Sequence, residues 1–429
     1  MGLGIGYTSL AGILGILFGT VFMALHATQG PKLGLPQMIQ SRAQFGYRGV
    51  VVILAGAIFT FGGYAVVNLI YIDSGLHQVF GWDPVVVGSL SAAAATLLAV
   101  FGHHLMHRMA RLLLAVSLPF WVILTVAILL GRAGGHALRP TGFSWVAFAM
   151  VFAGAAAYNI TSAPYVSDYT RYLPASTPTR KVIFWVFAGA AGSPVWLIPL
   201  GAWFAAALGV DNPVTGLDVA GNHVFSGLGG TLALLSVLSL ISVTAINLYS
   251  GMLSMVTSVD SFRPLRPTRR WRIGGVCGLS FVCSVLGIVV ITDATTALND
   301  ALSVMLYLLA PWTAVNLVDF FIVRRGRYAV TDFFDRRGIY GGWNRRGLGG
   351  YLAGLAVEVP FMNLSSFVGP ASRLLGGTDV SFLIGMGVAG TWYFVAMAGH
   401  DPRHEHHAIE RSHRHLAAHG EVRLSGAAE

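Results

Sequence analysis

The stretch FGGYAVVNL, residues 61–69, places an aromatic ring and a carboxamide four residues apart in a strongly apolar run. In a helix, Tyr64 and Asn68 therefore share one face. Such a face suits a flat heterocycle, because the ring stacks on the solute while the amide both donates and accepts hydrogen bonds. The alternative is a glycine-mediated helix contact in which the amide bonds to a neighbouring helix.

A second polar group interrupts the apolar stretch GAAAYNITSAPY, residues 154–165. It holds Tyr158, Asn159, Thr161 and Ser162, and Pro164 removes a helix hydrogen bond and obstructs the preceding turn. Unwound backbone inside a membrane must be buried in protein or line a cavity, and secondary transporters bind substrate at such breaks. The stretch predicts either a substrate-binding break or a proline-kinked helix end.

Hydroxyl groups recur along residues 238–251, where the polar members are Ser239, Ser242, Thr244, Asn247 and Ser250. Hydroxyl and carbonyl oxygens suit a hard monovalent cation. A single hydroxyl in a membrane helix more often bonds to a neighbouring helix. Cation binding and helix contact both remain open for this stretch.

Glu358, in LAVEVPF, is the one acid clearly inside an apolar run. A carboxylate within a membrane is by default a candidate proton carrier. Because Pro360 follows closely, the alternative is a structural hydrogen bond from Glu358 to interrupted backbone, and we favour that alternative.

Asp168 and Arg171 appear together in PYVSDYTRYLP, residues 164–174, where an apolar run stops. A pair at this spacing can bridge, and the arginine can also reach the last carbonyls of its helix. We expect the pair to anchor the helix end at the level of the lipid headgroups, without touching substrate. The alternative is an exposed salt bridge worth about 0–1 kcal/mol.

The elements that position these residues follow from composition. Charged residues make up 10% of the 429 residues and apolar residues 55%, against about 25% charged in soluble domains. The mean hydropathy is +0.68, and apolar runs of about 18–25 residues match a bilayer core of about 30 Å. The sequence predicts an all-α polytopic membrane protein, whose spans satisfy their own backbone groups as helices.

We predict eleven spans in one transmembrane domain, residues 1–400, followed by a His- and Arg-rich tail, 401–429, that is expected to be disordered. The spans lie near 5–27, 50–72, 84–102, 112–131, 143–163, 182–209, 228–257, 273–292, 300–323, 348–367 and 380–399.

Basic residues orient these spans. Of the 27 Lys and Arg residues, 24 fall on one side, and the other side holds only Arg132, Arg139 and Arg373. The positive-inside rule makes the basic side cytoplasmic, so the C-terminus is expected inside and Met1 outside. An outside start without an orienting charge is unusual, and we expect that one upstream span is absent from this sequence.

Other function classes are disfavoured. The net charge of +9 is explained by loop arginines and not by nucleic-acid binding. Cys277 and Cys283 lie six residues apart in one apolar run, which supports neither a disulfide framework nor a CxxC metal site. GxSxG, HExxH and Walker A motifs are missing, so we expect no enzyme, no cofactor and no metal, and transport against a gradient would draw on an ion gradient.

Three stretches together resemble the nucleobase:cation symporter-1 family, and its purine–cytosine permease branch most of all. They are FMALHATQGPKLGLPQMIQSRAQFGYRG (22–49), PYVSDYTRYLP (164–174) and LLAPWTAVNLVDFFIVRRGRY (308–328) with FDRRGIYGGWNRRG (334–347). The resemblance implies a LeuT-type fold of two five-helix inverted repeats followed by two extra spans, so that the eleven spans correspond to the family's second to twelfth. In the family, the first span contributes to the substrate and cation sites.

The resemblance also assigns roles. The family's base-holding aromatic and amide fall on Tyr64 and Asn68, and its eighth-span amide falls on Asn247. The sixth-span binding region matches Tyr158 to Ser162, including Asn159, although the alignment is loose there. Family hydroxyls near a sodium site fall near Ser242 and Thr244, while proton coupling is more usual in this branch.

The sequence thus predicts a secondary transporter in the inner membrane that imports cytosine or a purine with H⁺ or Na⁺. A permease for uracil, allantoin, hydantoin or thiamine is an alternative. A truncated, non-transporting remnant, or a membrane binding or sensing module, is another.

Overall fold

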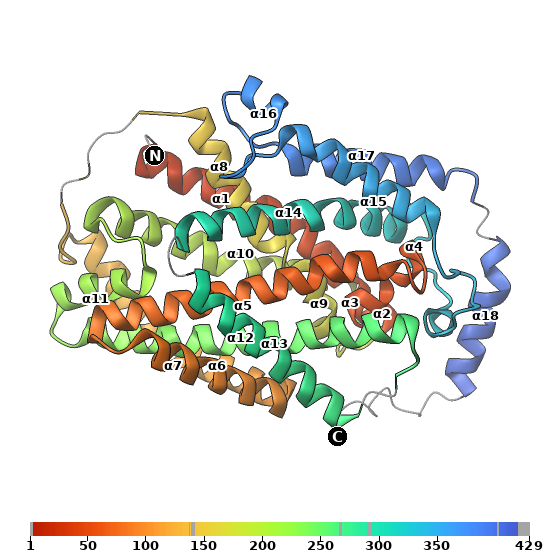
Figure 1. Cartoon of the computed structure of the whole chain (residues 1–429), viewed down its shortest axis with the longest axis horizontal. Coiled ribbons are helices and arrows are strands. Elements are labelled where there is room, and N and C mark those ends of the chain that lie inside the picture. The colour runs from red at the N-terminus through yellow and green to blue at the C-terminus, as the bar shows by residue number, and fades with distance from the viewer. Residues whose placement is uncertain are drawn as a thin grey trace.

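The computed structural model describes residues 3–136, 138, 142–265, 268–290, 294–400 and 403–418. Nearly all of this part of the chain is helical, and its one β-bridge pairs Asn363 with Val368. Eight of the described helices are long and apolar enough to cross a membrane. Most of the long helices run in roughly the same direction, along the longest axis of the molecule (Figure 1).

The α-helices have the following bounds: α1 Ile5–Ala27, α2 Gln29–Leu33, α3 Gln37–Gln40, α4 Arg42–Phe45, α5 Val50–Phe80, α6 Pro84–Phe101, α7 His103–Leu129, α8 Trp145–Ile160, α9 Ala163–Thr170, α10 Thr179–Trp203, α11 Pro213–Val224, α12 Leu228–Phe262, α13 Arg269–Val290, α14 Ala294–Val318, α15 Arg345–Glu358, α16 Pro370–Leu374, α17 Ser381–Ala396 and α18 Arg403–Ala418. Short π- or 3₁₀-turns are η1 Phe204–Leu208, η3 Asp319–Val323, η4 Val330–Phe334 and η5 Val359–Phe361.

Each predicted span contains a helix, with differences at the ends. The segment predicted at 50–72 continues as α5 to Phe80, where Gly81 ends it in the left-handed conformation. The segment predicted at 348–367 is helical only to Glu358, because Pro360 follows and the chain turns into η5. The count of eleven spans remains a prediction.

The tail differs more strongly from expectation, because Arg403–Ala418 form the helix α18 instead of a disordered segment. α18 lies across one end of the helix bundle, at a steep angle to the long helices (Figure 1). The remainder of the tail lies outside the described residues.

Glycines bring α1 against α8. A Cβ atom on Gly15 would lie 2.3 Å from the carbonyl oxygen of Phe152, and one on Gly19 would lie 2.3 Å from that of Ala156. Small residues allow such close backbone approach, which is how membrane helices gain packing contacts. α1 therefore supports α8, the part of this segment that precedes α9.

A central layer is formed by α5 and α12, which pack along their lengths and share the core cluster around Ala65, Leu248 and Met252. α5 also packs on α14 through Ile53, Leu54 and Trp312. Tyr64 and Asn68 thus lie on a helix that is held from two sides.

The segment from Thr28 to Gly49 forms a buried polar junction between the long helices. Arg42 donates to Asp260 Oδ2 at 3.0 Å and to the carbonyl of Phe333 at 2.9 Å, and its guanidinium lies over the Tyr47 ring. These contacts join the segment to the end of α12 and to η4. Because both partners are more than 200 residues away in sequence, the junction fixes the ends of several helices relative to one another.

Candidate functional site

The polar break in the apolar stretch 154–165 is present. α8 ends at Ile160, Thr161 and Ser162 form a turn, and α9 begins at Ala163 with Pro164 in its first turn. Proline is tolerated there because the first helical residues have no intrahelical acceptor for their N–H groups. The local hydrogen bonds run from Ser162 Oγ to the carbonyl of Tyr158, 2.7 Å, and from the Tyr165 hydroxyl to Ser162 Oγ, 2.8 Å.

Tyr64 reaches this break directly. Its hydroxyl lies 2.7 Å from Thr161 Oγ1, and Thr161 Oγ1 in turn donates to the carbonyl of Ala157 at 2.6 Å. The rings of Phe61 and Tyr165 pack beside this contact with centroids 5.3 Å apart. The aromatic face of α5 and the interrupted helix are therefore neighbours.

Asn68 links the same face of α5 to α12. Its Nδ2 donates to Thr244 Oγ1 at 3.2 Å, and Thr244 Oγ1 donates to the carbonyl of Leu240 at 2.8 Å. Asn247 lies one turn beyond Thr244 on the same helix face and is buried. Among the described residues, none forms a hydrogen bond with the Asn247 carboxamide. Tyr64, Asn68, Thr244 and Asn247 thus mark a polar crossing of α5, the α8–α9 break and α12.

Two residues that were predicted to lie at the break have side chains that are directed away from it. Asn159 Nδ2 donates to Thr20 Oγ1 at 2.6 Å and lies 3.4 Å from the carbonyl of Ala190, so its amide joins α8 to α1 and α10. Tyr158 is 51% exposed and lines a cavity of about 950 Å³ between α1, α8, α10 and α14.

The predicted ion-coupling residues do not form one group. Thr244 contacts Asn68, whereas the hydroxyl of Ser242 is buried and has no hydrogen-bond partner in the part of the chain that the structure describes. Glu358 is fully buried between α15 and α17, where a Cβ atom on Gly385 would lie 1.9 Å from its Oε1. Within the described ranges, neither carboxylate oxygen of Glu358 has a hydrogen-bond partner, so the expected structural bond to the interrupted backbone at Pro360 is not formed there.

A second cavity, also about 950 Å³, lies between α5, α11 and α13 and is lined by the Gly62 and Gly63 side of α5. Tyr64, Asn68 and Asn247 line neither this cavity nor the one at Tyr158. In this conformation the polar crossing is closed, because Tyr64 and Asn68 bond to other protein groups.

Asp168 anchors its helix, but not through Arg171. Its Oδ1 accepts from the backbone N–H of Gln37 at 3.2 Å, at the start of α3. Arg171 lies over the ring of Tyr172 and donates to the Tyr172 hydroxyl at 3.0 Å, and no ion pair joins Asp168 to Arg171 among the described residues. The expected bridge between the two charges is therefore not formed.

A relay of buried side chains, which the residue patterns did not reveal, extends this anchor. Ser167 Oγ donates to Gln37 Oε1 at 2.5 Å, Gln37 Nε2 donates to Gln29 Oε1 at 2.9 Å, and Gln29 Nε2 donates to Asn316 Oδ1 at 2.6 Å. The relay connects α9 to α14 through α2 and α3. Its sequence signal is that four glutamines recur over a short stretch, at 29, 37, 40 and 44.

Replacing Asp168 by Ala is expected to destabilise the protein by about 1.5–3 kcal/mol, since a buried backbone donor loses a charged acceptor. Arg171→Ala is expected to cost less than about 1 kcal/mol, since its contact with Tyr172 is exposed. Thermal unfolding in detergent compares the two variants. An equal or larger loss for Arg171→Ala would show that the arginine, and not the carboxylate, anchors the helix.

Comparisons with known proteins show which family this chain resembles. The family model described as permease for cytosine/purines, uracil, thiamine and allantoin matches residues 1–385. The putative purine-cytosine permease YxlA of Bacillus subtilis (strain 168) is 32% identical over 401 residues, which cover 92% of this chain and 86% of that protein. The purine-cytosine permease fcyB of Emericella nidulans is 26% identical, covering 90% of this chain and 76% of its own length.

Solved structures of Mhp1, a nucleobase-cation-symport-1 family transporter, share the fold. The closed conformation with bromovinylhydantoin bound superposes with a TM-score of 0.71 at 18% identity, covering 96% of this chain and 90% of that chain. The inward-facing conformation gives 0.65 at 17% identity, covering 92% and 84%. The likeness confirms the predicted LeuT-type helical fold of a multi-pass membrane protein.

Proposed function

The chain belongs to the family of permeases for cytosine/purines, uracil, thiamine and allantoin, a family of transporters and not of enzymes, and on that premise we propose that it imports cytosine or a purine across the inner membrane. The observation that best supports a substrate site is the crossing of α5, the α8–α9 break and α12. There Tyr64 bonds to Thr161, and Asn68 bonds to Thr244. Uptake is driven by a coupled ion, H⁺ or Na⁺, because ATP-binding motifs are missing.

The base binds by replacing contacts that the protein makes with itself. When the crossing opens, the base stacks on the Tyr64 ring and takes over the hydrogen-bonding groups of Asn68 and Asn247. Buried polar groups need partners, so a solute with matching donors and acceptors along its edge is selected over an apolar ring. Backbone groups near residues 158–164 that lose their helix partners when the break opens supply further partners, as at other broken helices.

Tyr158 and Asn159 take different roles. Tyr158, exposed in the cavity between α8 and α14, guides the base toward the break, and Asn159 holds α8 in place against α1. Ser162 supports the break through Tyr165. Of the ion-coupling candidates, Thr244 is part of the crossing, Ser242 lies two residues before it on α12, and Glu358 lies apart from the crossing at the end of α15.

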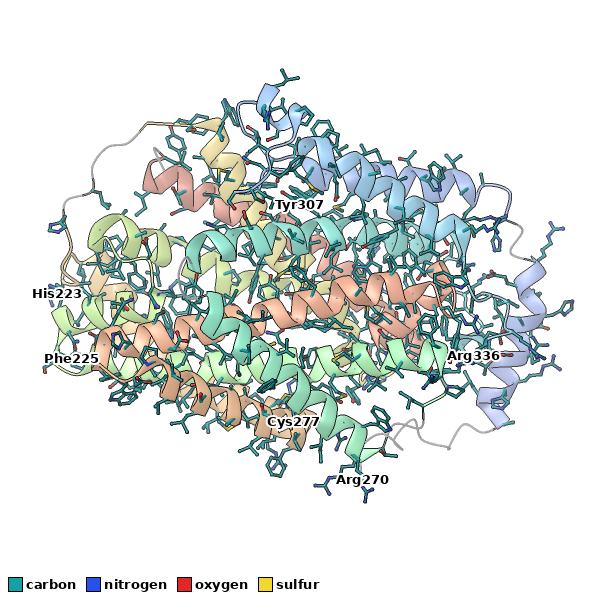
Figure 2. The ribbon with its side chains drawn as sticks, in the orientation of Figure 1. His223, Phe225, Arg270, Cys277, Tyr307 and Arg336 are labelled. Carbon is teal, nitrogen blue, oxygen red and sulfur yellow. The ribbon has the colours of Figure 1, made fainter. Side chains whose placement is uncertain are left out.

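Orientation follows from the loop charges. Arg336 and α18 lie at one end of the molecule, while His223 and Phe225 lie at the other (Figure 2). The Arg336 end belongs to the basic loops and is the cytoplasmic end by the positive-inside rule.

Uptake of labelled cytosine or adenine into cells expressing the chain tests the function. We expect accumulation that a protonophore or the removal of sodium abolishes. Accumulation that survives both treatments would contradict ion coupling, and failure to take up either base would contradict the substrate class. Competition by uracil, allantoin, hydantoin and thiamine then ranks the alternatives.

A further inference from the structure

Just beyond the end of α14, the buried Arg324 pairs with two acids. Asp319 lies five residues before it, and Glu405 lies 81 residues after it. Arg324 Nη1 lies 2.5 Å from Asp319 Oδ1, and Arg324 Nη2 lies 2.9 Å from Glu405 Oε1. Arg324 Nε also donates to both carboxylate oxygens of Glu405, at 3.2 and 3.1 Å. The exposed side-chain fractions are 5% for Arg324, 0% for Asp319 and 10% for Glu405, so water screens this cluster little.

At this cluster the backbone departs from regular α-helix in two places. Residues Asp319–Val323 form the π-turn η3, in which the backbone N–H of Arg324 bonds to the carbonyl of Asp319 at 2.8 Å. The wider turn brings the side chains of Asp319 and Arg324 together. The next residue, Arg325, has a φ of 50° although it is not glycine. π-turns and left-handed non-glycine residues both concentrate at functional sites.

Asp319 links the cluster to other elements through hydrogen bonds. It accepts from the hydroxyls of Tyr328 and Tyr393, each at 2.8 Å, and from Gln44 Nε2 at 2.6 Å. Gln44 belongs to α4, which leads within a few residues into α5, the helix that carries Tyr64 and Asn68. The connection is tight, because a Cβ atom on Gly46, with φ +87°, would lie 2.8 Å from the carbonyl of Gly342.

α18 completes the cluster from outside the bundle. Its buried stripe is Glu405, Ala408 and Ser412, and Ser412 Oγ accepts from the backbone N–H of Thr331 at 3.2 Å. Its other face, including Glu410, is exposed. In the described part of the chain, the attachments of α18 include the buried Arg324–Glu405 ion pair, the contact of His400 Nε2 with Glu405 Oε1 at 3.3 Å and the Ser412–Thr331 hydrogen bond, and they do not form a wide apolar face.

We propose that Glu405 is a positioning residue for transport, which acts through Arg324 and Asp319 to fix the α14 end and the α4–α5 corner. The inference rests on the proposed function for its link to uptake. Without Glu405, Arg324 retains Asp319 but loses its forked acceptor, and α18 loses its main attachment. The α14 end and α4 are then less restrained, and conformers that are open at this end become more populated.

Kinetics test this role. A protein that spends less time in the conformation that accepts the base from outside binds the external base with a proportionally weaker apparent affinity. We expect Glu405→Ala to raise the KM for external base about five- to tenfold, and Glu405→Gln to raise it less, because glutamine still accepts a hydrogen bond. Glu410→Gln, the matched exposed carboxylate on the same helix, is expected to match the wild type. A wild-type KM in Glu405→Ala would overturn the proposal.

A readout without substrate separates this inference from the proposed function. In purified protein, trypsin is expected to cleave α18 at Arg411 and Arg414 several-fold faster in Glu405→Ala than in the wild type or Glu410→Gln. Unchanged cleavage would overturn the docking role whatever the substrate proves to be. If the wild type takes up no base, the proposed function fails while the cleavage comparison still decides whether Glu405 holds α18.

A cross-link provides the rescue. The variant combines Glu405→Ala with Thr331→Cys and Ser412→Cys, which place a disulfide where the backbone of Thr331 meets Ser412. It also carries Cys277→Ala, which removes the exposed native thiol. Oxidation is expected to restore a KM close to that of the wild type, because the disulfide replaces the ion pair as the attachment. A KM that stays raised after complete cross-linking would show that Glu405 does not act by holding α18.

Discussion

Replacing Tyr64 by Ala is expected to raise the KM for the transported base about 5- to 150-fold, since stacking of a base on an aromatic ring is worth about 1–3 kcal/mol and each 1.4 kcal/mol is tenfold. The ring lies on α5 beside the α8–α9 break, with its hydroxyl 2.7 Å from Thr161 Oγ1. Alanine removes the stacking surface while α5 keeps its packing on α12 and α14.

Two conservative variants separate the ring from the hydroxyl. Tyr64→Trp is expected to transport with a KM near that of the wild type, because a larger ring still stacks. Tyr64→Phe keeps the ring and loses only the contact with Thr161, which base binding breaks, so its KM is expected to stay near that of the wild type. Kinetics of labelled cytosine uptake, normalised to the amount of protein in the membrane, distinguish these cases. A wild-type KM for Tyr64→Ala would remove the stacking role.

Asp319→Ala is expected to have the largest effect on stability. Asp319 is fully buried and accepts hydrogen bonds from Arg324, Tyr328, Tyr393 and Gln44. Removing one partner of a buried ion pair typically costs about 3–5 kcal/mol, and here three further buried donors, on Tyr328, Tyr393 and Gln44, also lose their acceptor. Glu405 remains to pair with Arg324, so the loss falls mainly on the contacts between α14, α17 and α4.

Unfolding of the purified protein in detergent, followed by heat or denaturant, measures this loss. Asp319→Asn is expected to be milder than Asp319→Ala, since the amide oxygen still accepts one of the hydrogen bonds. Glu410→Gln serves as the exposed control and is expected to stay within about 0.5 kcal/mol of the wild type. Wild-type stability of Asp319→Ala would mean that the buried cluster does not hold these helices together.

Much of the fold could be predicted because its signals are local. The length of each apolar run gives the helices, and Pro164 with its polar neighbours gives the break between α8 and α9. The spacing of Tyr64 and Asn68 predicts that they share a helix face, and the structure places that face against the break and against α12.

The remaining site features depend on partners that are far apart in sequence. Gln29 bonds to Asn316, Gln44 bonds to Asp319, and Arg324 bonds to Glu405. The position of a glutamine in the sequence does not indicate which distant residue it contacts. The relay and the ion cluster therefore could not be predicted from residue spacing. Asp168 illustrates the same limit, because the nearby Arg171 suggested a local pair while the observed partner is the backbone of Gln37.

The helix α18 was mispredicted for a related reason. Its sequence is rich in histidine and arginine and lacks an apolar stripe, which is typical of disordered tails. Its attachment instead uses the charge of Glu405 and the hydroxyl of Ser412, which are ordinary surface residues unless their partners are known.

The most direct test of the binding site is a structure of the protein with cytosine or adenine bound. We predict that the base lies against the Tyr64 ring and within hydrogen-bond distance of Asn68 and Asn247, with the contacts to Thr161 and Thr244 broken or rearranged. A base bound only in the cavity at Tyr158 or in the cavity beside Gly62, with the Tyr64–Thr161 and Asn68–Thr244 contacts unchanged, would contradict the account.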